Sequence, residues 1–261
     1  MILAVATALL VAQAAAPSGP PPSAEESRLV ACKDQARSDP ATAIATASGW
    51  LSEAQGPGRS APQQCLGFAY TSLLRWGAAE SAFLAAREAL LPADRTQRAR
   101  LAAMAGNAAL AGGRGEAALA AFDLGEEDAR VAGDRPLAGI IATDRARALV
   151  ALDRPAQAAE ALALARRDAP QDASAWLLSA TLARREDRLE EARGYIRTAA
   201  DLAPQDLSIV LEAGLIAALS GQDEAAQANW RAIVEQAPNS PEAEAARAYL
   251  AQLGAAGEIG R

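Results

Sequence analysis

The chain has 261 residues, of which 51% are hydrophobic but only 4% aromatic, and it contains no histidine. Without histidine it lacks the commonest general base and the usual nitrogen ligand of metals, which excludes histidine-dependent hydrolysis and histidine metal sites. A formal net charge of −7 has the wrong sign for a phosphate backbone, so we expect no nucleic-acid partner.

The N-terminal segment, residues 1–14, is apolar and carries no charged side chain. It is too short to span a bilayer but has the length of a signal-peptide core, with small residues for cleavage after Ala14. Residues 15–23 are rich in proline and predict an unstructured leader. We therefore expect a periplasmic or secreted protein without an integral membrane span. The alternative is a cytosolic protein whose apolar N-terminus is not cleaved.

Residues 24–60 predict a first pair of helices, although their match to the later repeats is poor. The break falls at Ser38, Asp39 and Pro40. The second helix of this pair is expected to bury Ile44 and Trp50.

Residues 61–238 contain five copies of one pattern. Pro170, Pro204 and Pro238 stand 34 residues apart, a period typical of stacked helix pairs. In each copy a small residue precedes a large apolar one by four positions, which places the two on one helix face. These pairs are Ala79 and Phe83, Ala118 and Phe122, Ala158 and Leu162, Ala192 and Ile196, and Ala226 and Trp230.

The copies differ in length and are followed by a separate end. The first copies are longer, with extra residues around 91–97 and 130–135, where we expect longer second helices or loops. In the fourth copy, Trp176 is expected to be buried between helices. Residues 239–253 predict a capping helix with one polar face, since the last repeat would otherwise expose its apolar side. Residues 254–261 are expected to be a frayed tail.

The fullest copy, with Leu66, Gly67 and Tyr70 followed by Ala79 and Phe83, resembles the tetratricopeptide repeat. The resemblance covers roughly residues 61–238, and with the apolar N-terminus it suggests an exported bacterial member of that family. It implies an all-α fold: a right-handed superhelical solenoid of about six antiparallel helix pairs plus a C-terminal capping helix.

The same resemblance implies a concave groove, lined by the first helices of the pairs, that binds an extended polypeptide. Arg147 and Arg184 are the expected anchors, because arginine binds carboxylates in planar, bidentate fashion. By repeat position the groove residues would be Phe68, Asn107, Arg147, Thr181, Arg184 and Leu215.

Cys32 and Cys65 fall on the expected first helices of two successive pairs, which lie side by side in tetratricopeptide repeat arrays. An even number of cysteines in an oxidising compartment favours a disulfide. We therefore expect a Cys32–Cys65 bond; the alternative is two buried thiols.

Two classes of function remain. The favoured one is a non-enzymatic scaffold or adaptor of the bacterial cell envelope that binds a protein or peptide partner and needs no cofactor. The alternative is an envelope carbohydrate-active enzyme, or its accessory subunit, that uses paired carboxylates. Paired buried carboxylates in a deep cleft would favour the enzyme, and an open groove would favour the scaffold.

Overall fold

Residues 23–259 are described by a computed structural model, and this part of the chain is helical, with no β-strand. It forms thirteen α-helices and one short 3-10 helix, η1 (Gly56–Arg59). The predicted six pairs and a terminal helix are confirmed. The pairs are α1 (Ala24–Ser38) with α2 (Pro40–Glu53), α3 (Ser60–Ser72) with α4 (Trp76–Ala89), α5 (Arg95–Ala111) with α6 (Gly115–Val131), α7 (Arg135–Ala151) with α8 (Pro155–Asp168), α9 (Ala173–Arg185) with α10 (Leu189–Leu202), and α11 (Leu207–Leu219) with α12 (Asp223–Gln236); α13 (Pro241–Ile259) follows.

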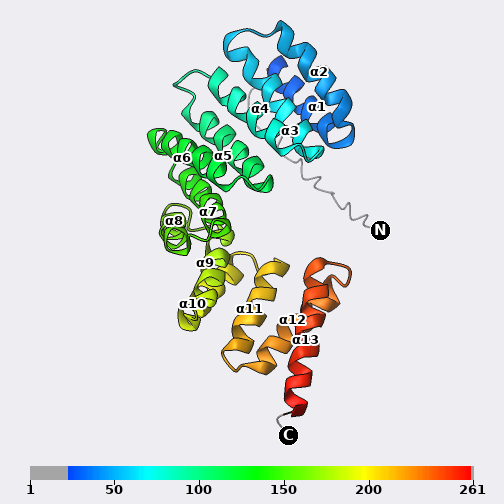
Figure 1. Ribbon diagram of the computed structural model, residues 1–261, viewed down its shortest axis with the longest axis vertical. Helices are drawn as coiled ribbons and strands as arrows, with labels where there is room; N and C mark the ends of the chain where they lie inside the picture. Colours follow the sequence, from blue (N-terminus) through cyan, green and yellow to red (C-terminus); the bar gives the residue numbers. More distant parts are fainter. Residues whose placement is uncertain (1–22, 260–261) are drawn as a thin grey trace, which may run out of the picture.

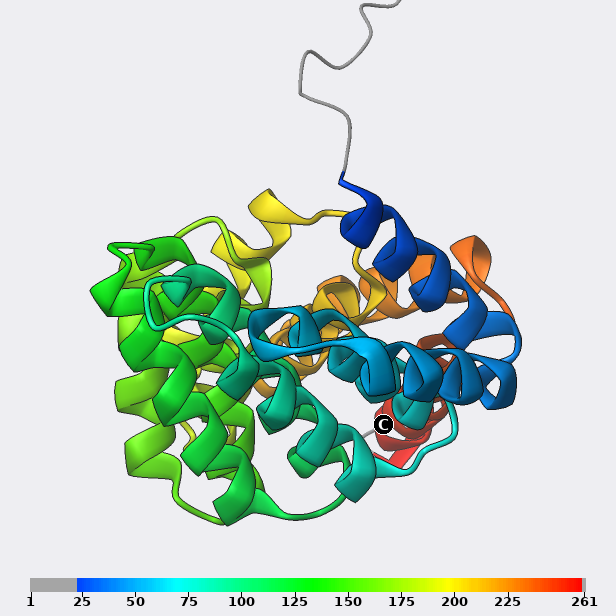
Figure 2. The same cartoon turned by 90° about the horizontal axis from the view of Figure 1, so that it is seen from above.

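The pairs stack in chain order from α1 and α2 at one end to α13 at the other (Figure 1). Seen from above, the stack curves instead of running straight (Figure 2). The first helices of successive pairs contact one another: α1 with α3, α5 with α7, α7 with α9, and α9 with α11. They form a layer whose exposed side we call the first-helix face.

The two helices of each repeat interlock through a small residue and a large one sixteen positions later. A Cβ atom added to Gly106 would lie 2.5 Å from the ring of Phe122, well inside van der Waals contact. Glycine therefore stands where the facing side chain is aromatic, and alanine where it is aliphatic. The five pairs are Gly67 with Phe83, Gly106 with Phe122, Ala146 with Leu162, Ala180 with Ile196, and Gly214 with Trp230.

The turn inside each repeat also has one geometry. From α3 to α11, the second residue after the end of each first helix has a left-handed backbone. The N–H of the following residue donates to a carbonyl five positions earlier, as from Arg75 to the Tyr70 carbonyl at 2.8 Å. This is the Schellman ending of a helix. The left-handed residues are Leu74, Gly113, Asp153, Asp187 and Gly221, with φ between 56° and 72°. One turn therefore recurs although its residues differ.

The extra residues of the first copies lie mostly in helices. As expected, α6 is long, with 17 residues against 14 in α4 and α8, and a loop precedes α5. However, the first helices α5 and α7 also have 17 residues, against 13 in α9 and α11. Sequence reasoning missed this extra turn, which begins at Arg95 in α5 and at Arg135 in α7.

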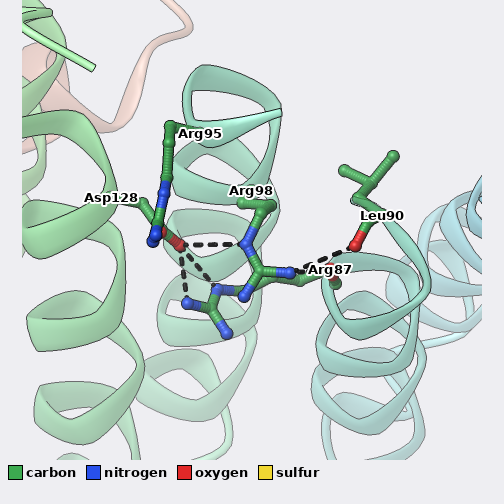
Figure 3. A network of polar contacts seen from close by, with 5 residues as sticks. All are labelled: Arg87, Leu90, Arg95, Arg98 and Asp128. Atoms are coloured by element: carbon green, nitrogen blue, oxygen red, sulfur yellow. Dashed lines mark hydrogen bonds and ion pairs between the residues drawn. The ribbon is translucent and has the colours of Figure 1, made fainter. Parts of the chain in front are cut away.

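The added turns carry a buried ionic network at the junction of α4, α5 and α6 (Figure 3). The Asp128 side chain is only 1% exposed and accepts hydrogen bonds from Arg87, at 2.6 and 3.0 Å, and from Arg95, at 2.6 Å. Arg98 lies 3.6 Å from the same carboxylate and donates to the Leu90 carbonyl at 3.3 Å. Burial raises the pKa of the Asp128 carboxyl, but the arginines lower it more, so that it stays below its ordinary value.

Three expectations about single elements need correction. Trp50 is buried, but Ile44 is only half-buried. Trp176 is also half-buried: its ring packs 6.1 Å from that of Tyr195, and its Nε1 donates to the Pro170 carbonyl at 2.9 Å. The terminal helix does not end at residue 253, because α13 continues to Ile259.

Candidate binding face

Two hollows open on the first-helix face, and both are mostly apolar. The first, which we call the aromatic hollow, lies between α3 and α5 over α4. It is lined by Phe68, Thr71, Trp76, Phe83, Met104, Asn107 and Ala108. The second, the arginine hollow, lies between α7 and α9 over α8. It is lined by Ala146, Arg147, Val150, Leu162, Leu178, Thr181, Leu182 and Arg185.

The structure brings four of the six residues predicted for the groove into these hollows. Phe68 and Asn107 line the aromatic hollow, and Arg147 and Thr181 line the arginine hollow. Leu215 is partly buried against the apolar cluster of α11 to α13 and lines neither hollow. Four of the predicted positions therefore fall in two pairs, one pair in each hollow.

The aromatic hollow has a cation beside it. The rings of Phe68 and Phe83 meet edge to face with centroids 5.4 Å apart, and the Lys33 Nζ lies 5.0 Å from the Phe68 centroid. Lys33 is the only lysine of the chain. Burial lowers the pKa of its ammonium group. A cation held against a ring in this way is attracted by the negative face of the aromatic system.

The arginine hollow has two arginines at its edge. Arg147 pairs with Asp144 of its own helix, which also accepts a hydrogen bond of 2.9 Å from Asn107, and the Arg147 side chain remains 40% exposed. Arg185 is exposed, and no salt bridge among the described residues includes it, whereas its neighbour Arg184 is paired. Sequence reasoning missed Arg185, although it lies four positions after Thr181 and therefore on the same helix face.

Arg184, predicted as a groove anchor, is engaged inside the protein. Its Nε and Nη2 donate to the two carboxylate oxygens of Glu212 at 2.7 and 3.2 Å, and both side chains are largely buried. This fork joins α9 to α11, the first helices of two successive repeats. The guanidinium is therefore occupied in holding the array together, and Arg185 stands in its place on the face.

The N-terminal pair is tied to the array by a covalent bond. Cys32 of α1 and Cys65 of α3 form the predicted disulfide, with Cα atoms 6.0 Å apart, and both are buried. The predicted signal peptide, residues 1–14, and most of the leader, 15–23, lie outside the described residues. None of the described helices has the length and hydropathy to cross a membrane.

The protein is similar to known proteins in its structure but not detectably in its sequence. No protein-family model matches the sequence, and no curated protein matches it either. Among solved structures it resembles PilW, described as a widely conserved type IV pilus biogenesis factor, with a TM-score of 0.66 at 17% identity over 85% of this chain and 97% of that one.

Two further structures agree. PilF of Pseudomonas aeruginosa superimposes with a TM-score of 0.65 at 17% identity, over 87% of this chain and 100% of that one. YrrB, a tetratricopeptide repeat protein with an unusual peptide-binding site, gives 0.51 at 18% identity, over 77% and 97% of the two chains. At these identities the likeness concerns the fold. Together with the repeat spacing, it shows that this chain is a helical solenoid with the tetratricopeptide repeat fold.

Proposed function

We propose that this protein is a non-enzymatic interaction scaffold or adaptor of the bacterial cell envelope, and that it binds a partner polypeptide along the first-helix face. The observation that carries the proposal is the pair of apolar hollows at the predicted groove positions. Each hollow lies between neighbouring repeats and is open at the surface, so that two well-separated side chains of an extended chain could enter them.

Two observations support a place in the envelope. A buried disulfide is typical of proteins that fold in an oxidising compartment. The chain also covers nearly the whole length of PilW, a protein described as a pilus biogenesis factor. We extend to this chain only the general idea of a part in envelope assembly.

No observation favours the carbohydrate-active alternative. Neither hollow has an acidic side chain in its lining. Within residues 23–259, no group of three or more histidines, cysteines or acids is placed to hold a metal ion. The open, apolar hollows match the surface of a scaffold better than a site for carboxylate catalysis.

Site-specific photo-crosslinking in the native host tests the proposed binding face. A photoreactive residue at Asn107 or at Thr181 should capture the same partner polypeptide, identified by mass spectrometry. The control is the same residue at Arg197, which is exposed on the second helix α10. If the partner is captured at Arg197 and at neither groove position, the proposed face is wrong.

Intact-mass measurement of the protein from the envelope fraction tests the compartment. We expect a mature chain that begins near Ala15 and whose two cysteines resist alkylation until a reductant is added. A full-length chain with two freely alkylated thiols, found in the cytosolic fraction, would contradict export.

A further inference from the structure

The two hollows carry enough information to describe the segment that would fill them, provided that the proposed function holds. Both are lined mainly by apolar side chains, which fits them for the side chains of a partner and not for its backbone. The aromatic hollow, built around Phe68, Phe83 and Met104, suits a bulky aliphatic or aromatic group. The arginine hollow, built around Val150, Leu162 and Leu178, suits an aliphatic one.

The charged side chains in the linings of the two hollows are basic. Lys33 stands against the ring of Phe68 beside the aromatic hollow. Arg147 and Arg185 border the arginine hollow. Asp144, which pairs with Arg147, also accepts a hydrogen bond from Asn107 and has a side chain only 14% exposed. Although the whole chain is acidic, this face therefore favours acidic residues in a partner, and charge complementarity of this kind selects among partners.

The spacing of the hollows sets the spacing of the anchors. From the α3–α5 junction to the α7–α9 junction there are two steps between first helices, and packed helices lie about 8–10 Å apart, so the distance is roughly 16–20 Å. An extended chain advances about 3.3 Å per residue, which makes the separation about five to six residues, of which six is the even number. An even separation also directs both anchors to the same side of an extended strand.

We propose that the first-helix face recognises an extended, acidic segment whose two apolar anchors stand at positions i and i+6, each next to an Asp or Glu. The first anchor enters one hollow and the second the other. Asn107 lines the aromatic hollow, and its Nδ2 donates to Asp144 of α7; its exposed amide can also bond to the backbone of the segment. The neighbouring acids pair with Lys33 at one end and with Arg147 and Arg185 at the other.

Fluorescence polarisation with short synthetic peptides tests the proposal. The matched peptide has Leu at i and i+6, each followed by Asp, with Ser and Thr elsewhere. Four comparison peptides have Leu at i and i+3, Ser in place of the first Leu, Ser in place of the second Leu, or Lys in place of each Asp. We expect the matched peptide to bind at least about tenfold more tightly than each of them.

Charge reversal in the protein provides the second arm. Arg185→Glu and Lys33→Glu should each weaken binding of the matched peptide about fivefold or more, while Arg197→Glu, the same change on α10, should leave it unchanged. Circular dichroism of each variant checks that the fold is retained. Equal affinity at both spacings, equal effects of Arg185→Glu and Arg197→Glu, or no binding up to about 1 mM overturns the proposal.

The peptide result and the crosslinking result separate the two proposals. Capture at Asn107 and Thr181 with no preference for the i and i+6 peptide rejects this motif but leaves the binding face in place. If no partner is captured at either Asn107 or Thr181, both the binding face and the motif are rejected.

Discussion

At the scale of the residue, the fit between Gly106 and Phe122 shows why the repeats vary in an ordered way. The ring occupies the space that a Cβ of residue 106 would need. The third repeat meets the same requirement with Ala146 against Leu162. Alanine is larger than glycine, and leucine is smaller than phenylalanine. Volume is therefore conserved across the pair and not at either position.

Replacing Gly106 by Ala should destabilise the protein by about 1–3 kcal/mol, because the ring of Phe122 must move out of a packed core. The control, Gly194→Ala on α10, places a Cβ in open space and should stabilise by about 0.5–1 kcal/mol through helix propensity. The double change Gly106→Ala with Phe122→Leu, which copies the third repeat, should recover part of the loss. Urea unfolding measures all three; a neutral Gly106→Ala would show that the interlock is loose.

Glu126 is a second residue whose surroundings predict a measurable effect. It is 4% exposed, and its Oε1 has no hydrogen-bond partner, although Oε2 pairs with Arg130 and Arg145 lies 4.0 Å away. Burial raises the pKa of the carboxyl, and the two arginines offset only part of that rise. The folded state therefore holds this proton more tightly than the unfolded state.

The sign of the pH dependence follows from linkage. The stability due to Glu126 is fully present below its unfolded pKa, about 4.3, and is lost as pH rises through the higher folded pKa. As pH rises above about 4.5, the unfolding free energy of the wild type should therefore fall relative to that of Glu126→Gln. Urea titrations at a series of pH values measure it; a constant difference would mean that Glu126 titrates normally.

At the scale of the element, the Asp128 network holds three helices at one junction. One carboxylate serves Arg87 of α4 and Arg95 and Arg98 of α5, and removing its charge would leave these arginines without their shared counter-ion. Removal of one partner from a buried ionic cluster typically costs about 3–5 kcal/mol.

We therefore expect Asp128→Asn to destabilise by about 3 kcal/mol, since asparagine keeps one acceptor oxygen. The matched control is Asp123→Asn on the same helix, whose side chain is 62% exposed and pairs only with Arg145; it should change stability by less than about 1 kcal/mol. Equal effects of the two substitutions in chemical denaturation would argue that the network contributes nothing beyond surface charge.

The disulfide acts on elements as well, because it fastens α1 to α3 at the end of the array that has the poorest repeat pattern. Replacing both Cys32 and Cys65 by Ala should lower the free energy of unfolding by about 2–4 kcal/mol, given the 33-residue separation of the two cysteines. A reductant should destabilise the wild type by a similar amount and leave the double variant unaffected. If reduction does not change the free energy of unfolding, the disulfide does not stabilise the protein.

At the scale of the whole molecule, stability in a repeat array is a sum over neighbouring contacts and need not be uniform. The largest buried cluster extends from Ala99 to Leu182 and joins α5 to α9. The clusters near the two ends are smaller. Local opening is therefore expected to begin outside the middle of the array.

Native-state hydrogen exchange should show this gradient. We expect backbone amides of α5 to α8 to exchange at least about tenfold more slowly than those of α11 and α12, because opening of an end repeat leaves the middle packed. In the reduced protein, α1 and α2 should exchange faster while α5 to α8 do not change. Uniform protection along the array would indicate a single cooperative unit instead.

Much of the fold could be read from local signals. The 34-residue period, the Ala and large-residue pairs and the capping acids each specify helix pairs that stack, because each depends on residues close together in the chain. The pairing of Cys32 with Cys65 was expected because the family resemblance places the first helices of adjacent pairs side by side. The helix turn added to α5 and α7 could not be read in this way, since the same extra residues could equally have formed loops or longer second helices.

For the candidate site, too, some features could be predicted from the sequence and others could not. The sequence by itself determined that Phe68, Asn107, Arg147 and Thr181 are equivalent positions of successive first helices, because periodicity defines a helix face. Only the tertiary structure decided which arginine is available. Arg184 and Arg185 are adjacent, about 100° apart around the helix, and Glu212, which lies 28 residues further on, pairs with Arg184. Whether an arginine is paired or exposed depends on which side chain the packing of the next repeat places beside it. The local sequence pattern does not specify that side chain.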